Sequence, residues 1–296
     1  MEFDILKKCM LCPRNCGVDR YKTFGVCGAD YRLKIAHYSV HMWEEPIISG
    51  RNGSGTIFFS NCNLSCKFCQ NYEISQLGKG HEITIEELAS IMIKQQEAGV
   101  HNINLVTPTM YVYQIIEAIK IARKNGLNIP IIYNSNGYEN VETIKALKGY
   151  IDVYLPDLKY YSNEIAVKYS KAPNYFEIAS KAILEMINQV GEPIFDEDGM
   201  IKKGVMIRHL VLPNHIQNSK NVLKWIKENI PEEIYIDVMA QYFPTYKAKE
   251  DELINRKLTK REYKEIENYF YLLDFKNGYM QELGEHEEEY VPKWEK

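Results

Sequence analysis

The 296-residue chain has no cysteine after residue 69, so all seven of its cysteines lie in the first quarter of the sequence. A disulfide framework normally uses an even number of cysteines spread along a chain, and this distribution argues against one. Reduced cysteines that cluster in this way are typical of metal ligation in a reducing compartment. The seven cysteines are therefore candidate metal ligands.

Other features are scarce as well. No apolar run approaches the roughly 18 residues that a membrane-spanning helix needs, and the start, MEFDILKKCMLC, lacks the long apolar stretch of a signal peptide. The net charge is only −4, which gives no broad attraction to nucleic acid. The composition, 45% hydrophobic and 26% charged, is that of an ordinary globular protein. We therefore expect a cytoplasmic protein with neither a membrane nor a nucleic acid as partner.

From residue 55 onward, short apolar segments alternate with amphipathic ones. The expected strands are 56–60, 102–107, 130–135, 151–159, 205–213 and 235–243. Capping-box pairs, Thr84 with Glu87 and Thr259 with Glu262, mark the starts of two expected helices. This alternation predicts an α/β fold with parallel strands and right-handed crossovers. Six such units suit a partial barrel or an open doubly wound sheet, and spacing alone does not separate the two.

The first 50 residues break this alternation. We expect a small N-terminal cysteine-rich module at 1–50, an α/β domain at 51–280 and an acidic tail at 281–296. The module holds four cysteines with the spacing C-x2-C-x3-C-x10-C: Cys9, Cys12, Cys16 and Cys27. Four thiolates complete a tetrahedral site that suits zinc or iron, and the compressed spacing of the first three is also typical of iron–sulfur cluster loops. Zinc, a second cluster and free thiols remain the alternatives.

Three further cysteines follow the first expected strand, at the end where parallel α/β folds build their sites. They are Cys62, Cys66 and Cys69, and Phe68 stands directly before the last of them. A structural zinc site needs four ligands, but no fourth cysteine or histidine is near, since His81 is twelve residues on. A cubane cluster normally takes four thiolates. Three cysteines would therefore leave one iron open.

This C-x3-C-x-aromatic-C motif resembles that of the radical S-adenosylmethionine (SAM) superfamily, whose fold is a partial (β/α)6 barrel of the TIM type. The resemblance implies a [4Fe–4S] cluster held by the three cysteines, with SAM bound to the open iron through its amino and carboxylate groups. It also implies one-electron cleavage of SAM to a 5′-deoxyadenosyl radical that abstracts hydrogen, with flavodoxin or ferredoxin as the type of electron donor. An open cluster is sensitive to oxygen, so we expect an anaerobic setting.

Other positions match the activating enzymes of that superfamily, which carry an Asn-Gly turn after the third strand and Asp-x-Lys after the fourth. The chain has Asn136-Gly137 and Asp157-Leu158-Lys159 there. In those enzymes these positions face SAM and, in one subgroup, hold a monovalent cation. The resemblance therefore makes candidates of Asn134, Ser135, Asn136, Asp157 and Lys159. A plain ion pair between Asp157 and Lys159 is the alternative.

The chain departs from the superfamily after the second strand, where many members carry Gly-Gly-Glu to bind the SAM amino group. It has Val106-Thr107-Pro108-Thr109 instead, and the hydroxyls of Thr107 and Thr109 are hydrogen-bond acceptors that can substitute. On the fifth strand Arg208 and His209 are further candidates. Adjacent strand residues point to opposite faces, so at most one of these two faces the interior. Gln241 and Tyr242 are candidates on the sixth strand.

The chain resembles most closely the family described as pyruvate formate-lyase activating enzyme-related, through about residue 280. The matching segments are CMLCPRNCGVDR, EEPIISG, GSGTIFFSNCNLSCKFCQNYEIS, NLVTPT, YLPDLKYY and RHLVLP. The resemblance implies an oxidoreductase that activates a glycyl-radical enzyme by taking hydrogen from a glycine of that partner. Hydrogen abstraction from a peptide or small-molecule substrate is a second hypothesis. A non-catalytic iron–sulfur or zinc scaffold that binds a partner is a third.

Overall fold

One curved sheet organises residues 2–284, which are the residues that the computed structural model describes. Ten strands form it in the order β10-β9-β8-β6-β5-β4-β2-β1-β3, with β7 paired to β8. Their bounds are β1 Lys34–His41, β2 Ser54–Phe59, β3 His81–Glu82, β4 Ile103–Val106, β5 Ile131–Ser135, β6 Val153–Pro156, β7 Ile194–Phe195, β8 Ile201–Leu210, β9 Tyr235–Met239 and β10 Gly278–Met280. The run from β2 to β10 is parallel, whereas β1, β3 and β7 pair antiparallel.

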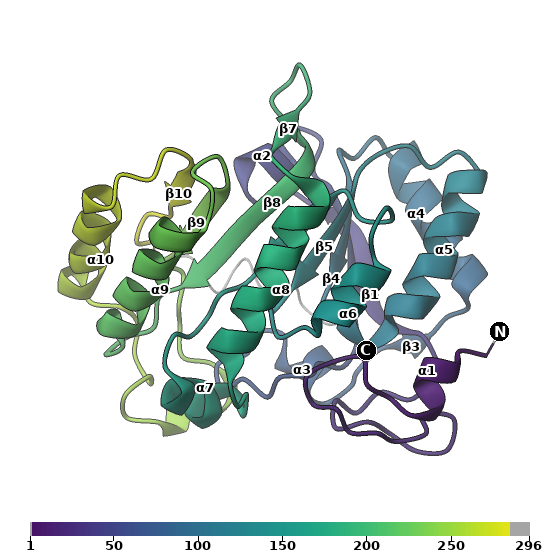
Figure 1. The fold of residues 1–296 in the computed structure, drawn as a ribbon, viewed down its shortest axis with the longest axis horizontal. Coiled ribbons are helices and arrows are strands. Elements are labelled where there is room, and N and C mark those ends of the chain that lie inside the picture. The colour runs from purple at the N-terminus through teal and green to yellow at the C-terminus, as the bar shows by residue number, and fades with distance from the viewer. Residues whose placement is uncertain (1, 285–296) are drawn as a thin grey trace.

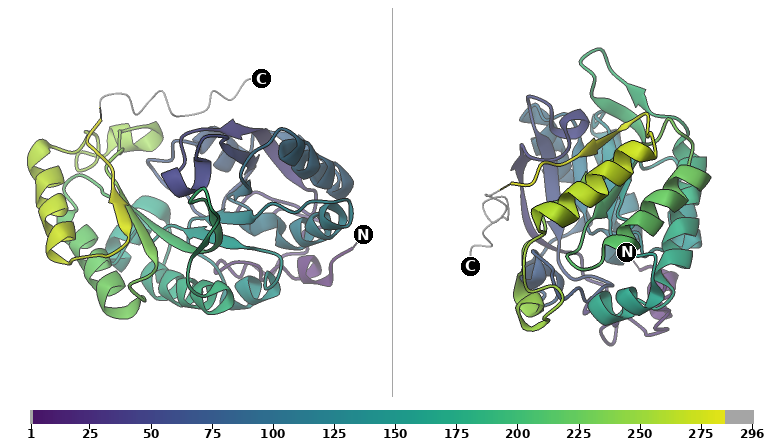
Figure 2. Two further views of the ribbon diagram at one scale, coloured as in Figure 1. Left: turned by 90° about the horizontal axis from the view of Figure 1, so that it is seen from above. Right: turned by 90° about the vertical axis from the view of Figure 1, so that its left-hand side faces the viewer.

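Helices cover the outer side of the curved sheet, as the view from above in Figure 2 shows, and Figure 1 labels them along the chain. The α-helices are α1 Asp4–Lys7, α2 Pro46–Ser49, α3 Tyr72–Ser75, α4 Ile85–Glu97, α5 Val112–Lys124, α6 Val141–Ala146, α7 Asn163–Ser170, α8 Tyr175–Val190, α9 Ile216–Asn229 and α10 Lys260–Leu272, with 3-10 turns η1 Thr109–Tyr111 and η2 Tyr246–Glu250. Both predicted capping boxes are present, at the starts of α4 and α10. The predicted α/β class with parallel strands is confirmed.

Alternation along the strands separates two cores. The large one fills the space between the outer face of the sheet and the helices. The small one lies on the inner face, where Ile132, Val153 and Met206 meet Ile48 of α2. Because side chains at i and i+2 share a face, these residues set which later residues of each strand point inward. The inner core therefore lies next to the carboxyl ends of the strands, where further inward-facing side chains follow.

The structure corrects three expectations about elements. Residues 34–41 were assigned to the cysteine-rich module, but they form β1, which pairs along β2 at the edge of the main sheet. The fifth predicted strand begins earlier, at Ile201, and pairs antiparallel with β7. The short strand β10 was not predicted at all. The predicted acidic tail falls largely on residues 285–296, outside the described residues.

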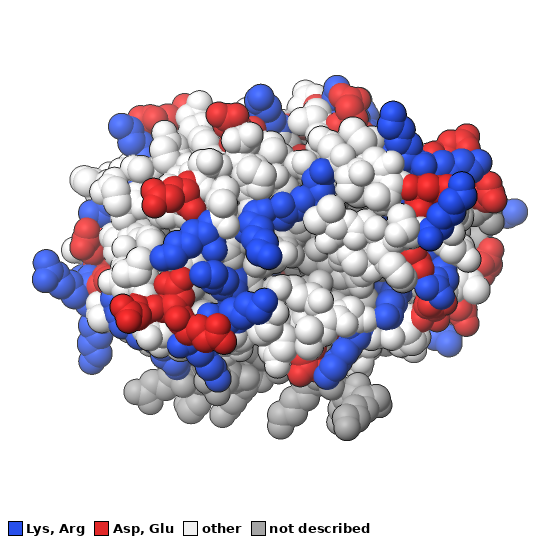
Figure 3. All heavy atoms as spheres, turned by 90° about the horizontal axis from the view of Figure 1, so that it is seen from below, with Lys and Arg blue, Asp and Glu red and all other residues white. Residues whose placement is uncertain are grey.

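No helix within residues 2–284 is long and apolar enough to cross a membrane. On the face that Figure 3 shows, lysine and arginine side chains lie among aspartate and glutamate side chains. This interspersed pattern agrees with the small net charge of the sequence, −4.

Candidate functional site

A cavity of about 550 Å³ opens at the carboxyl ends of the parallel strands. The strand register explains its wall. Phe58 of β2 pairs with Val106 of β4, and Val106 pairs with Asn134 of β5, so these three side chains share the inner face. Asp157 follows β6 and forms a bridge with Arg208 of β8, and both side chains continue the wall. The cavity thus collects residues from separate strands at one end of the sheet.

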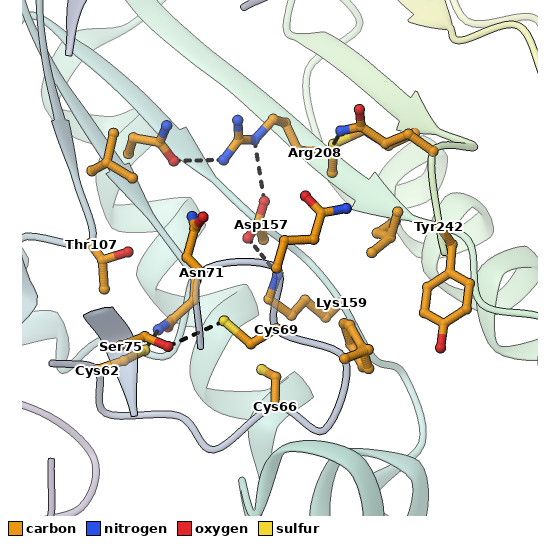
Figure 4. A pocket seen from close by; sticks show the side chains of 18 of the residues that line it. Cys62, Cys66, Cys69, Asn71, Ser75, Thr107, Asp157, Lys159, Arg208 and Tyr242 are labelled. Atoms are coloured by element: carbon orange, nitrogen blue, oxygen red, sulfur yellow. Dashed lines mark hydrogen bonds and ion pairs between the residues drawn. The ribbon is translucent and has the colours of Figure 1, made fainter. Parts of the chain in front are cut away.

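All three cysteines of the loop after β2 line this cavity (Figure 4). Each sulfur has a polar neighbour from another part of the fold. The Asn136 amide donates to Cys62 Sγ at 3.4 Å, the Ser170 hydroxyl donates to Cys66 Sγ at 2.9 Å, and Ser75 Oγ lies 3.2 Å from Cys69 Sγ.

A network of paired charged side chains lies across the cavity from the cysteines. It consists of Asp157, Lys159 and Arg208 and is called the ionic ladder here. Asp157 accepts hydrogen bonds from Lys159 Nζ at 2.6 Å and from Arg208 Nε at 3.2 Å, and Arg208 Nη2 donates to Asn134 Oδ1 at 2.5 Å. Burial alone would raise the pKa of Asp157, but the positive charges of Lys159 and Arg208 outweigh it and hold the pKa below its usual value. Asp157 is therefore a carboxylate at neutral pH. The cavity carries cysteines on one side and fixed charges of both signs on the other.

The sequence model of the radical SAM superfamily matches residues 56–226, which span β2 to α9 and include the three cysteines and the ladder. The chain belongs to the radical SAM superfamily. An uncharacterised protein of Methanocaldococcus jannaschii is 38% identical over 89% of this chain and 73% of its own length. The pyruvate formate-lyase-activating enzyme of Clostridium pasteurianum is 21% identical over 60% of this chain and 70% of its own length.

Solved structures share the radical SAM fold at low identity. SuiB of Streptococcus suis bound to S-adenosylmethionine has a TM-score of 0.50 at 14% identity, covering 75% of this chain and 48% of SuiB. The FeFe-hydrogenase maturase HydG from Carboxydothermus hydrogenoformans has a TM-score of 0.51 at 13% identity, covering 78% of this chain and 53% of HydG. The chain thus spans about half the length of each of these structures.

The residues present fit the [4Fe–4S] cluster and SAM that the superfamily implies. Three soft thiol ligands and hydrogen-bond donors to sulfur suit iron–sulfur ligation. Burial raises the pKa values of all three thiols, that of Cys69 to about 11, so ligation would release their protons. Among residues 2–284, no three histidine, cysteine, aspartate or glutamate side chains lie close enough together to hold a single metal ion.

Most of the predicted cofactor-binding residues lie at the cavity. Phe68, Thr107, Ser135 and Asn136 line it together with Asn134, Asp157, Lys159 and Arg208, and so do Gln241 and Tyr242. Thr107 has a backbone φ of 58°, a left-handed conformation that is costly for a β-branched residue. Such strain persists where the surroundings impose it, which is common at functional sites. Thr107 thus lines the cavity directly after β4 with an unusual backbone conformation.

Two predicted residues do not line the cavity. The Thr109 hydroxyl is fully buried and donates to Glu139 Oε1 at 2.6 Å. His209 points to the opposite face of β8 from Arg208, as alternation requires, and its ring nitrogens lie 2.7 Å from the Leu158 carbonyl oxygen and 2.8 Å from Ser219 Oγ. The prediction that at most one of Arg208 and His209 faces the interior is confirmed. Thr109 and His209 therefore form hydrogen bonds on the side of the strands that faces away from the cavity.

Residues from the end of β1 to the start of α2 also reach the cavity, and no sequence pattern predicted them. His41, Trp43 and Glu44 line it. The Glu44 carboxylate accepts from Asn104 Nδ2 at 3.2 Å and lies 3.4 Å from Arg208 Nη1. No sequence signal marked these residues, because they lie more than 50 positions from most of their partners. The run EEPIISG was noted only as a point of resemblance.

A pair of buried carboxyl groups lies beneath Arg208. Asp237 is 1% exposed, and neither of its carboxyl oxygens has a hydrogen-bond donor. Glu45 is its neighbour, and Glu45 Oε2 also lacks a donor. Burial raises the pKa of Glu45 to about 7 and, with the nearby charge of Glu45, that of Asp237 to about 8. With these raised pKa values, the pair keeps a proton at neutral pH.

The N-terminal cysteines lie apart from this cavity. Backbone bonds from Cys9 N to Val18 O and from Asn15 N to Cys12 O fold the segment into tight turns. A Cβ at Gly25 would lie 3.2 Å from Cys27 Sγ and 3.7 Å from Cys16 Sγ, so glycine leaves room for two sulfurs side by side. Burial raises the pKa of the Cys12 thiol to about 12. The buried Cys9 and the partly buried Cys12, Cys16 and Cys27 suit metal ligands better than reactive nucleophiles.

Proposed function

We propose that this chain is a radical SAM enzyme that uses Cys62, Cys66 and Cys69 to hold a [4Fe–4S] cluster and cleaves SAM reductively. The observation that carries this proposal is the single cavity onto which the three cysteines and the ladder of Asp157, Lys159 and Arg208 open. When bound, the cluster supplies one electron to SAM, which yields methionine and a 5′-deoxyadenosyl radical for hydrogen abstraction. A reduced flavodoxin or ferredoxin in an anaerobic cytoplasm is the electron source that we propose.

The residues of the chain bind and orient SAM. Lys159 and Arg208 provide positive charge for its carboxylate, while Asn134, Ser135 and Thr107 provide oxygen acceptors for its ammonium group. Asp157 fixes both basic side chains, since each donates to one of its carboxylate oxygens. We assign Asp157 to positioning Lys159 and Arg208. An ionised carboxylate has about four acceptor sites, so a monovalent cation beside Asp157 remains part of the proposal.

For the substrate, we propose a protein segment, with activation of a glycyl-radical enzyme as the first candidate. The sheet ends at β10 on one side and at β1 and β3 on the other. Side chains near these two ends, Trp43 and Gln281, line the same cavity, and we propose that the substrate segment enters between them. The similarity to the Clostridium pasteurianum activating enzyme supports this candidate. SuiB, which shares the fold, was solved bound to its precursor peptide SuiA, and a peptide substrate is the second candidate.

We further propose that the cysteine-rich part of residues 1–50, ahead of β1, forms a metal-binding module next to a barrel that contains residues 51–280. Cys9, Cys12, Cys16 and Cys27 would be the ligands, and zinc or a second iron–sulfur cluster would be the metal. Soft thiolates suit either. Elemental analysis of a variant in which Cys62, Cys66 and Cys69 are all serine distinguishes them, because iron in that variant belongs to the module.

Product analysis tests the main proposal. Anaerobically reconstituted and reduced protein should release 5′-deoxyadenosine from SAM, and Cys66→Ala should abolish the release while the N-terminal metal stays bound. Binding of SAM without cleavage by the reduced wild type would refute the enzyme proposal. A carbon-centred doublet in the electron spin resonance spectrum of a mixture with a glycyl-radical enzyme would support activation. A doublet that appears equally with Cys66→Ala would count against it.

A further inference from the structure

One side chain of the N-terminal module, Arg14, forms a hydrogen bond with the loop of Cys62, Cys66 and Cys69. Its Nε donates to the carbonyl oxygen of Asn63 at 2.7 Å. Its Nη1 donates to the Lys171 carbonyl, and Nη2 lies 3.5 Å from the Ser170 carbonyl oxygen. The guanidinium therefore joins three segments: the module, the cysteine loop and the C-terminal end of α7.

The segments that accept hydrogen bonds from Arg14 also carry groups that contact the sulfurs of Cys62 and Cys66. Asn63 follows Cys62 directly, and its Oδ1 accepts at 2.8 Å from the same Asn136 amide that donates to Cys62 Sγ. On the other side, the Ser170 hydroxyl donates to Cys66 Sγ, and the Ser170 carbonyl accepts from the backbone N of Ser65 at 3.1 Å. A shift of Arg14 would thus loosen the supports of both sulfurs.

Physical chemistry favours arginine at this junction. The last carbonyl groups of a helix have no partner within the helix, and they form the negative end of its dipole. A guanidinium carries donors in a planar fork that can reach several carbonyls at once, whereas an ammonium group is a point charge on a flexible stem. The Arg14 guanidinium also lies 5.5 Å from the centre of the Tyr138 ring, which limits its movement.

The backbone of Arg14 belongs to the four-cysteine segment. A turn closed by Asn15 N and Cys12 O at 3.0 Å contains Arg14, and Cys16 follows it. A metal held by Cys12 and Cys16 would fix this turn from both sides. Whatever orders the module therefore also orders Arg14.

We propose that Arg14 is a positioning residue for Cys62 and Cys66, and that the N-terminal cysteine module acts on the radical SAM site through it. The proposal rests on the proposed function of Cys62, Cys66 and Cys69 as cluster ligands. It gives the module a task beyond its own stability, because the metal state of one cysteine set governs how firmly the other holds its iron.

The first experiment compares full-length wild type, Arg14→Ala and the matched control Arg123→Ala after anaerobic reconstitution. Arg123 also donates to two backbone carbonyls, those of Gly149 and Tyr150, but it lies away from the cysteines. The readouts are the part of the electron spin resonance spectrum that changes when SAM is added, and the rate at which a chelator removes the iron responsible for it. Hydrogen bonds from a charged donor support an expectation of about tenfold faster iron loss and an altered spectrum for Arg14→Ala. Arg123→Ala should match the wild type.

A wild-type spectrum and iron-loss rate for Arg14→Ala would overturn the proposal. If Arg14→Ala does not fold, Arg14→Lys keeps the charge without the fork and should still lose iron several-fold faster than the wild type. Wild-type behaviour of Arg14→Lys would overturn the proposal in the same way. If the wild type binds iron but forms no 5′-deoxyadenosine, the proposed function fails, while iron retention still tests Arg14.

A double-mutant cycle tests the link to the module. Cys12→Ser removes one proposed ligand of the module, and it should raise the iron-loss rate of the 62/66/69 site as Arg14→Ala does. If the module acts through Arg14, the double variant should be no worse than either single variant, because residues in one network are not additive. Multiplicative effects, or no effect of Cys12→Ser, would contradict the link.

Discussion

Asp237→Asn tests the buried carboxyl pair beneath the cavity. In the wild type the pKa values of Glu45, about 7, and of Asp237, about 8, lie well above the ordinary values of these side chains. The folded protein therefore keeps a proton that the unfolded chain has already released above about pH 5. Stability that is present below the unfolded pKa values is lost as pH rises toward the folded ones.

The expected loss of stability with rising pH follows from one proton that the folded protein retains and the unfolded chain does not. Each pH unit changes the free energy of unfolding by about 1.4 kcal/mol for each proton of difference. Between pH 5 and pH 7 the pair should thus cost the wild type about 3 kcal/mol of stability, or about 5 °C in Tm for a chain of this size. The amide of Asp237→Asn can donate to Glu45 without titrating. The variant should therefore lose less stability over the same range.

Melting curves followed by circular dichroism, recorded anaerobically at pH 5, 6 and 7, measure this difference. Asp198→Asn is the control, because Asp198 is an exposed side chain in the β7–β8 hairpin. The wild type and the control should show the same decline in Tm, and Asp237→Asn a shallower one. Parallel curves for the wild type and Asp237→Asn would refute the expectation that the pair retains a proton.

Two further substitutions test the wall of the cavity. Gly137→Ala should cost about 2 kcal/mol or more and weaken SAM binding in equilibrium dialysis, because φ is 75° and the new Cβ would lie 2.2 Å from the Asp157 carbonyl oxygen. Gly126→Ala, where φ is 98° and nothing lies within 4 Å, should change stability alone. Thr109→Val removes the donor to buried Glu139 and should lower stability by about 1–3 kcal/mol with the KM for SAM unchanged. A Thr109→Val variant with normal stability and a raised KM would place Thr109 at the substrate instead.

The positions of the three cysteines, Asp157 and Lys159 at the cavity could be predicted because short sequence patterns mark them. The spacing of Cys62, Cys66 and Cys69 after a strand, and Asp157 with Lys159 after another, placed them at the same edge of a parallel sheet. Strand alternation also limited Arg208 and His209 to one inward-facing residue. Which of the two faced inward depended on the register of β8 with β9, where Arg208 pairs with Asp237. The sequence pattern shows that adjacent strand residues face opposite sides of the sheet, but it does not show which of them faces inward.

The missed residues depend on contacts between distant parts of the chain. Arg14 lies 156 positions from Ser170, and Glu44 lies 164 positions from Arg208. Thr109 looked like a ligand because it stands two residues after Thr107, but the chain turns into η1 there and carries Thr109 behind the wall. The strand β10 has only three residues, too few to show alternation. Such features follow from packing in three dimensions, which no local pattern records.

The supports of the three sulfurs show why the motif alone does not make the site. Asn136 after β5, Ser170 at the end of α7 and Ser75 in α3 each contact a different cysteine sulfur. Hydrogen bonds to ligand sulfurs help set the reduction potential of an iron–sulfur cluster. The potential of a cluster held here would therefore depend on three separate elements, and Arg14 joins one of them to the N-terminal module. In our proposal, the second cysteine set would influence the first through this contact, without sharing any ligand with it.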